Sequence, residues 1–336
     1  MISGLKRQKQ TVPPANGRDN AYWKPQSKGW ILAADAAVWL ALAISVCVPD
    51  AQAVNSLYYR IALVSFAVAW AAVWVASARA GGLRAKLYHY SQLVAALGAA
   101  LAVWDLLSTK SGILQLPFFP GPAQIVEVMC RERATLLVST LHSMRLFFAG
   151  LACGVVLGIV TGVLIGWNRQ WNYWLFPVVK VAGVIPPVAW IPLALVIFPT
   201  SFQAGVFLLT LASWFSIAFM VSGGIASTPK SYFEVSRTLG ADGRFLLFHV
   251  AVPHAVPHIF TGIATSAGMC FMTLVITEMI GAKAGLGWYI NWARAWAAYD
   301  KVYASIIIMG VAFCVILAVI GLFRNYFLRW QKGIIK

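Results

Sequence analysis

The sequence has 336 residues, of which 60% are hydrophobic and only 11% are charged; the formal net charge is +16 and the mean hydropathy is +0.77. Soluble domains are about half apolar and about a quarter charged, so this composition excludes an ordinary soluble domain. Several apolar runs exceed the roughly 18 residues that a transmembrane helix needs, which predicts an all-α polytopic membrane protein. The basic residues are assigned to cytoplasmic loops that face anionic lipid, because no basic–aromatic pattern favours nucleic-acid binding.

The N-terminal quarter is predicted to hold a basic tail and two membrane helices. Residues 1–29 are polar and basic, which is typical of a cytoplasmic tail. The segment 30–88 contains apolar spans at 30–48 and 61–78. The sequence AQA at 51–53 resembles a signal-peptidase site, but the apolar run before it is long for a secretion signal. We therefore favour a retained helix over a cleaved leader.

Six further spans are expected in the segment 89–336, which makes eight in all. When both termini are placed in the cytoplasm, most Lys and Arg residues fall in the inner segments, as the positive-inside rule requires. The outer segment 112–133 has three prolines followed by apolar residues at helical spacing. Either a short amphipathic helix at the outer interface or a solvated loop fits this pattern. The six spans are 89–107, 146–167, 176–198, 203–225, 258–280 and 302–323.

The span at 176–198 is predicted to be broken, because several prolines interrupt it and proline removes a backbone donor. A broken helix is tolerated beside protein or water rather than lipid, and such helices often line transport paths. Glu278 is an intramembrane carboxylate, which is a functional candidate by default. It is expected either to touch the path or to be structural, and Lys283 or Arg294 could pair with it. The candidate path residues are Pro186, Pro187, Trp190, Pro192 and Glu278.

Small residues inside the spans carry two further expectations. Glycines at 150, 154, 158, 162 and 166 recur every four residues, a pattern that predicts a close approach of another helix. Five cysteines form no CxxC pair and are interpreted as small buried hydrophobes rather than metal ligands or disulfide partners. They are Cys47, Cys130, Cys153, Cys270 and Cys314. Two acidic residues, Asp35 and Asp105, lie close enough to span ends to reach water.

The charged segment 227–257 is predicted to form a helix–turn–helix elbow on the cytoplasmic face. Ser231-x-x-Glu234 fits a capping box at a helix start, and Gly240 is expected to end that helix in the left-handed conformation. A second helix is expected to start near Asp242, and two prolines, at 253 and 257, are expected to break it before the next span. On local physics alone, a capped connector explains the segment about as well as a docking element.

The spacing Glu234-Val235-Ser236-x3-Gly240-x9-Val250-x-Val252-Pro253 resembles the EAA motif of ABC-importer permeases, Glu-Ala-Ala-x3-Gly-x9-Ile-x-Leu-Pro. The sequences LPFFPGPAQIVEVM, VIPPVAWIPLALVIF and TEMIGAKAGLGWYI resemble three further motifs of the nitrate/sulfonate/taurine/bicarbonate permease group, in the family's order. The resemblance covers about 112–333. One departure is VIFPTSF, where the family usually continues with Trp-Phe-Gly, which puts the outer end of that path in doubt.

This resemblance implies a six-helix type I ABC-importer permease core at 89–336, with the spans of 30–88 as two additions that have no counterpart in the family core. It implies a subunit of the bacterial inner membrane that imports a small anion such as nitrate, bicarbonate, taurine or an alkanesulfonate. The implied partners are two copies of an ATP-binding ABC subunit, a second permease that is identical or different, and a periplasmic substrate-binding protein.

The resemblance also assigns the coupling role to the elbow 227–257, which would dock on the ATPase. No Walker A motif occurs in the sequence, so ATP and magnesium are expected on the partner; this chain is expected to bind no cofactor or metal and to have no enzyme activity of its own. Charged residues would bond the partner, phenylalanines would be buried against it, and Pro253 would fix the exit into the next span. The implied coupling residues are Glu234, Val235, Ser236, Arg237, Gly240, Asp242, Phe245, Phe248 and Pro253.

Two other classes of protein are weighed against this one. An ion-gradient-driven secondary transporter is the alternative function, but it requires clear coupling-ion carboxylates or inverted repeats, and neither is evident. A membrane metalloenzyme is less favoured, because the five histidines form no HExxH motif.

Overall fold

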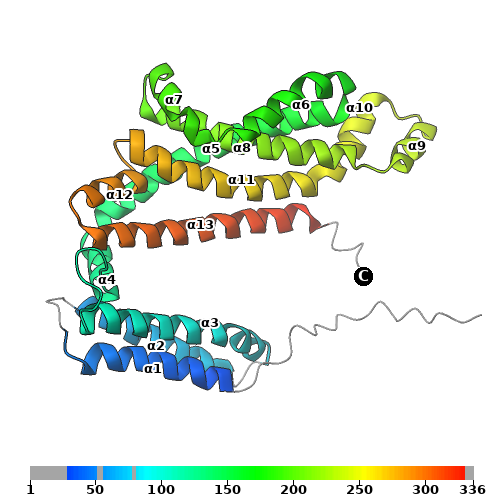
Figure 1. Ribbon diagram of the computed structural model, residues 1–336. Coiled ribbons are helices and arrows are strands. Elements are labelled where there is room, and N and C mark those ends of the chain that lie inside the picture. Colours follow the sequence, from blue (N-terminus) through cyan, green and yellow to red (C-terminus); the bar gives the residue numbers. More distant parts are fainter. Residues whose placement is uncertain (1–28, 51–55, 78–80, 330–336) are drawn as a thin grey trace, which may run out of the picture. The chain divides into compact units, whose positions relative to one another are not determined.

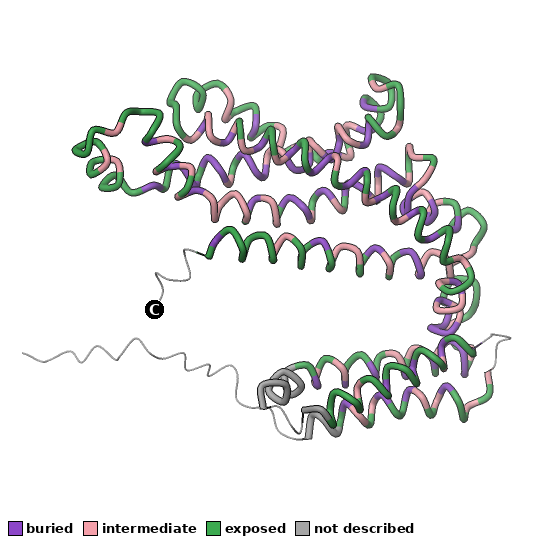
Figure 2. Tube along the Cα trace, turned by 180° about the vertical axis from the view of Figure 1, so that it is seen from behind, coloured by how far each residue is buried: buried purple, intermediate pink, exposed green. Residues whose placement is uncertain are grey.

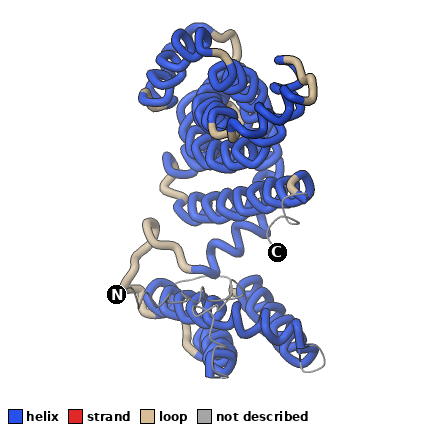
Figure 3. Tube along the Cα trace, turned by 90° about the vertical axis from the view of Figure 1, so that its right-hand side faces the viewer, coloured by secondary structure: helices blue, strands red, loops and turns tan. Residues whose placement is uncertain are grey.

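The computed structural model describes residues 29–50, 56–77 and 81–329, and helices make up most of them (Figure 3). The AQA sequence at 51–53 and nearly all of the basic tail lie outside the described residues, so both expectations stay predictions. The chain divides into two compact units, one of residues 1–114 with 121–123 and one of 115–120 with 124–336.

Unit 1 contains three helices, α1 (Gly29–Cys47), α2 (Leu57–Ser77) and α3 (Gly81–Asp105). The π-helical turn η1 (Leu106–Lys110) ends α3. Gly98 of α3 lets α1 approach closely, since a Cβ atom there would lie 3.1 Å from the carbonyl carbon of Ala37. The predicted span 89–107 covers the end of α3 and the start of η1, and α3 packs with α1 and α2 in this unit. The proposed core boundary at residue 89 stays a prediction.

Asp105 does not reach water from its place near the end of α3. Its exposed fraction is 1%, and it lies within electrostatic reach of Lys110 and Arg60. Lys110 is itself buried and bonds Asp50 at 2.6 Å and the carbonyl of Val48 at 2.6 Å. The expectation of a solvated Asp105 is therefore wrong, because polar side chains from α2 and from η1 lie around it in the fold. Asp35 is partly exposed and accepts a hydrogen bond from Trp70 Nε1 at 2.7 Å.

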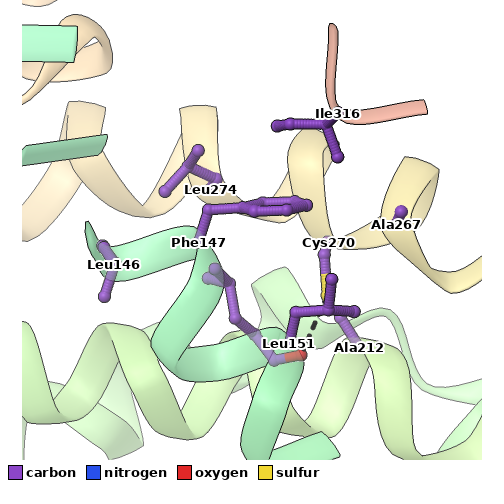
Figure 4. Close-up of a cluster of buried hydrophobic side chains, with 9 residues drawn as sticks. Leu146, Phe147, Leu151, Ala212, Ala267, Cys270, Leu274 and Ile316 are labelled. Atoms are coloured by element: carbon purple, nitrogen blue, oxygen red, sulfur yellow. Dashed lines mark hydrogen bonds between the residues drawn. The ribbon is translucent and has the colours of Figure 1, made fainter. Parts of the chain in front are cut away.

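Unit 2 is built on four long helices that run side by side (Figure 1). They are α5 (Arg133–Trp167), α8 (Ser201–Ala226), α11 (Val252–Gly281) and α13 (Tyr299–Phe327). Helix α8 is the most buried of the candidate spans. Figure 4 shows one part of the core, where Phe147 of α5 lies among Leu274 and Cys270 of α11 and Ile316 of α13. The Cys270 thiol donates to the carbonyl of Leu209 at 3.2 Å.

The predicted glycine stripe packs against α8, as its spacing indicated. A Cβ atom at Gly154 would lie 1.7 Å from Ser213 Oγ, and one at Gly158 would lie 2.7 Å from Ile217 Cβ. The same conflict would arise at Gly150, Gly162 and Gly166, each against a successive turn of α8. Glycine therefore lets the two backbones come closer than any side chain would permit, and we call this contact the glycine seam.

Two shorter elements confirm local predictions. The span rich in proline is broken into α6 (Arg169–Val184), the 3-10 turn η2 (Pro187–Trp190) and α7 (Ile191–Ile197), with a bend of 91°. The outer segment contains a real helix, α4 (Pro122–Arg131), rather than only a loop. A further short helix, α12 (Leu286–Ala295), follows α11.

Within residues 29–50, 56–77 and 81–329, length and apolar composition identify six helices that could cross a membrane, or seven if the bent pair counts as one span. The described apolar part of α1, Ala33–Cys47, is shorter than a span, so the eighth span stays a prediction. The interpretation of the cysteines as buried hydrophobes holds for Cys270 alone. The other four, Cys47, Cys130, Cys153 and Cys314, are exposed in the single chain, because they lie on helix faces that no other part of the described chain covers.

Candidate functional site

The elbow begins with α9 (Lys230–Thr238). The predicted capping box is wrong, because Pro229 occupies the N-cap position and the helix begins one residue before Ser231. With φ −59° and ψ 134°, Pro229 has the extended conformation of a helix cap, and it makes no side-chain cap bond. Ser231 therefore lies inside the first turn, where it cannot cap the helix.

The end of α9 is as the sequence predicts. Gly240 has a φ angle of +86°. Its amide donates to the carbonyl of Arg237 at 2.9 Å, and the amide of Ala241 donates to the carbonyl of Ser236 at 3.0 Å. These two bonds form a Schellman motif, which needs a left-handed residue and therefore favours glycine. Asp242 then caps the next helix, since its Oδ1 accepts from the amide of Phe245 at 2.8 Å.

The second helix of the elbow is not broken by proline. The short helix α10 (Gly243–Phe245) and the π-helical turn η3 (Leu246–Ala251) lead directly into α11. The whole segment Gly243–Gly281 is long and apolar enough to cross a membrane as one span. The predicted break fails for two reasons. Pro253 lies in the first turn of α11, and the π turn before it accommodates the change in hydrogen bonding. Pro257 is tolerated within α11.

Two aromatic pairs that the sequence did not reveal stabilise the elbow, and one of them, Phe233 with Trp167, holds it to the rest of unit 2. Phe233 packs on the core cluster at the ends of α8 and α11, and its ring lies 6.0 Å from that of Trp167. The ring of Tyr232 meets that of His254 edge-on at 6.3 Å. Each partner is distant in the sequence, so no local pattern could have identified these pairs.

The surface of the elbow that faces away from the rest of unit 2 is exposed. No residue of α9 is buried, and Figure 2 shows the elbow as mostly exposed. Large apolar side chains are among the exposed ones: Val235 at 60%, Leu239 at 83%, Phe245 at 47% and Phe248 at 62%. Exposed apolar groups among charged ones are typical of an interaction site.

A groove of about 400 Å³ lies beside α9 and brings Glu234 and Arg237 together with Lys230, Phe233 and Trp167. The other predicted coupling residues lie on the same elbow; Ser236 is half-buried, while Gly240, Asp242 and Pro253 are exposed. This arrangement can offer charge-assisted hydrogen bonds and apolar contacts to a protein partner. Among residues 29–50, 56–77 and 81–329, no group of three or more His, Cys, Asp or Glu side chains could hold a metal ion.

The predicted path residues fall into two places. Pro186, Pro187, Trp190 and Pro192 lie together at the bend between α6 and α7. Trp190 packs against the cluster of Ile191, Ala194, Ala204 and Leu208, and its buried Nε1 has no hydrogen-bond partner within the described chain. Glu278 lies instead near the end of α11, where its partners differ from those predicted.

Glu278 is 1% exposed and pairs with neither Lys283 nor Arg294. Its Oε2 accepts from Ser143 Oγ and from the amide of Gly287, both at 2.8 Å. The amide groups at a helix N-terminus stabilise a negative charge, so the start of α12 replaces the expected cation. Ser143 precedes Glu278 by 135 residues, and no local sequence signal links the two.

A second polar cluster joins α5, α12 and α13 near the same end of unit 2. Glu132 forms an ion pair with Lys301 and accepts a hydrogen bond from the hydroxyl of Tyr289. Partial burial alone would raise the pKa of the Glu132 carboxyl, but the hydrogen bonds from Lys301 and Tyr289 outweigh burial, so this pKa is lowered. Burial and the nearby Glu132 raise the pKa of the Tyr289 phenol.

Membrane transport subunits often contain broken helices, and unit 2 combines one with an exposed, capped elbow. The family described as binding-protein-dependent transport system inner membrane component matches residues 154–333, which is more than half of the chain. The chain belongs to this family, the permease subunits of ABC transporters.

Curated relatives agree with this membership. The bicarbonate transport system permease protein CmpB of Synechococcus elongatus is 29% identical over 251 residues, which cover 70% of this chain and 86% of that protein. A putative ABC transporter permease of Methanocaldococcus jannaschii, MJ0413, is 28% identical over 240 residues, 69% of this chain and 89% of the relative. The nitrate import permease protein NrtB of Synechococcus elongatus is 26% identical over 227 residues, 64% of this chain and 78% of NrtB.

Solved structures support the fold. A chain of the MetNI methionine ABC transporter in an inward-facing conformation matches with a TM-score of 0.52 and 20% identity, over 59% of this chain and 98% of that chain. A chain of an amino acid ABC transporter crystallised with histidines matches with a TM-score of 0.50 and 16% identity, over 60% and 97%. The helical core is therefore that of ABC-transporter permeases.

Proposed function

We propose that this chain forms the translocation path of an ATP-driven importer for a small anion and receives the movement of a separate ATPase through the elbow 227–257. The observation that carries the proposal is the elbow itself. It is held to the core by Phe233, yet it exposes Leu239, Phe245 and Phe248. A connector with no partner would have no reason to expose these side chains to water.

The geometry of the elbow fits the transmission of movement. The Schellman turn at Gly240 fixes the angle between α9 and the following helix, and Asp242 caps that helix. Glu234 and Arg237 flank the groove at α9 and are free to bond a partner surface. A capped elbow with an anchored base moves as one body, which is what coupling to ATP hydrolysis requires.

The proposed substrate is a small anion, and the support comes from relatives. Proteins named for bicarbonate and for nitrate transport are among the similar sequences. Taurine and alkanesulfonates belong to the same proposed class. The retention of one of these anions by the periplasmic binding protein that works with this chain would identify the substrate directly.

The proposed assembly contains two ATP-binding subunits, which hold ATP and magnesium, a second permease and a periplasmic substrate-binding protein. The chain is placed in the inner membrane with both termini in the cytoplasm and with two spans in 30–88 outside the six-helix core. The positive-inside distribution of Lys and Arg supports this orientation.

The test compares two elbow variants in the reconstituted transporter. Gly240→Val forces a branched residue into φ +86°, although nothing lies within 4 Å of its Cβ position, and Glu234→Lys reverses the charge at the groove. Both are expected to assemble in the membrane and to hydrolyse ATP without uptake. Gly321→Val is the matched control, because its Cβ position is also open and its φ is not left-handed. Normal ATP-driven uptake by both elbow variants would contradict the coupling role, and uptake on an ion gradient by this chain alone would favour a secondary transporter.

A further inference from the structure

The elbow and α12 lie at opposite ends of unit 2, and α11 connects them (Figure 1). Helix α11 has 30 residues, so it extends over about 45 Å at 1.5 Å per residue. It continues the second helix of the elbow through the π turn without a break. A displacement of the elbow can therefore be passed along α11 to the residues at its far end.

The far end of α11 is bonded to α12 and to α5 through one carboxylate oxygen. Glu278 Oε2 accepts from the amide of Gly287 in α12 and from Ser143 Oγ in α5, both at 2.8 Å. Ser143 Oγ in turn accepts from the amide of Leu286 at 2.8 Å. A second contact between the two helices comes from Asn291 Nδ2 of α12, which donates to the carbonyl of Met279 at 3.0 Å.

The backbone around Glu278 leaves no room for other residues. Gly285 has φ +121°, and a Cβ atom there would lie 2.3 Å from Glu278 Oε1. A Cβ atom at Gly287 would lie 2.6 Å from the carbonyl oxygen of Val275 and 2.7 Å from Glu278 Cβ. The two glycines let the start of α12 close over the carboxylate, which explains why glutamate and the GLG sequence occur together.

The energetics tie α12 to α11. A buried carboxyl group in a membrane helix is costly unless it is hydrogen-bonded, and removal of one hydrogen-bond partner leaves a buried polar group unsatisfied. Movement of α12 away from α11 would break the hydrogen bond from the Gly287 amide to Glu278 and the one from the Leu286 amide to Ser143. These hydrogen bonds therefore favour movement of α12 together with α11.

We propose that Glu278 is a positioning residue that, with Ser143, couples α12 to α11, so that movement of the elbow reaches the opposite face of the transporter. This inference rests on the proposed coupling function of the elbow. In that function, α12 would change the opening of the path on the substrate side when the ATPase closes. In this role Glu278 holds α12 to α11 and does not bind substrate.

The test follows α12 in the complete reconstituted transporter. Trp296, which is 73% exposed at the end of α12, is replaced by cysteine in a background whose five native cysteines are serine, and an environment-sensitive dye is attached. Trapping of the ATPase with vanadate is expected to change the dye signal in this reference protein. Glu278→Met, which has a similar length and offers only a weak sulfur acceptor, is expected to lose more than half of that change while basal ATP hydrolysis persists.

Ser143→Ala is the second variant, because it removes one donor and leaves the carboxylate in place. A partial loss of the dye signal is expected for it and for Glu278→Gln, which keeps one acceptor. Thr277→Val is the matched control, since Thr277 is buried beside Glu278 and its hydroxyl has no hydrogen-bond partner within the described chain. An undiminished dye response in Glu278→Met and Ser143→Ala would overturn the inference. If the reference protein shows neither ATP-driven uptake nor a dye response, the proposed function fails instead.

Discussion

The glycine seam and the elbow both depend on glycine, but for opposite reasons. Gly154 and Gly158 have no room for a Cβ atom, because α8 lies against them. Gly240 has open space around it and is required only for its left-handed backbone. Close approach marks the part of the molecule that must stay together, whereas the open turn lies in the part that we propose to face a partner. Stability and coupling are therefore expected to fail separately.

The largest effect is expected in the seam. Gly158→Val would place methyl groups against Ile217, and overpacking of this kind costs about 1–3 kcal/mol or more of folding free energy. The variant is expected to show a lower melting temperature in detergent and less folded protein in the membrane. Gly310→Val, whose Cβ position is open, serves as the control. Equal stability of the two variants would show that the two helices can move apart enough to accept a side chain in the glycine seam.

The next effect concerns binding of the ATPase and leaves stability nearly unchanged. Phe248 is 62% exposed, so Phe248→Ala removes little from the core but removes an apolar group from the elbow surface. We expect about tenfold weaker binding of the ATPase subunit, which corresponds to ~1.4 kcal/mol. Titration of the detergent-solubilised permease with the ATPase measures this affinity. An unchanged affinity would remove Phe248 from the interface.

The smallest effect is a pH dependence of the Glu132 cluster. Because the pKa of Glu132 is lowered in the folded protein, its ion pair with Lys301 contributes stability above the unfolded pKa of about 4.3. That contribution is lost as the pH falls through the lowered pKa. Melting temperatures between pH 7 and pH 3 should therefore fall slightly less for Glu132→Gln than for the unaltered chain. Since the Glu132 side chain is 29% exposed, a large difference would be inconsistent with this account.

Sequence patterns predicted the parts of the fold that depend on local chemistry. The four-residue repeat of glycine predicted the seam, the prolines predicted the bend of 91°, and Gly240 with Asp242 predicted the turn of the elbow. Each of these depends on residues within a few positions of one another. The spacing of residues along the sequence was therefore enough to predict these three features.

Contacts between distant segments could not be predicted in this way. Lys283 and Arg294 were the cations that could pair with Glu278, yet its partners are a serine on α5 and the backbone of α12. The break expected at Pro253 failed because a π-helical turn before it adjusts the backbone, and a π turn has no clear sequence signal. Asp105 was expected in water because its neighbours in the fold were not visible in the sequence.

The central claim is that the elbow is the docking surface for the ATPase. A photo-crosslinking residue at Leu239, which is 83% exposed, can be compared with one at Val196, which is 85% exposed on α7 at the opposite end of unit 2. The account predicts that, in membranes with the ATPase subunit co-expressed, the probe at 239 crosslinks to the ATPase and the probe at 196 does not. Crosslinking at 196 with none at 239 would contradict it.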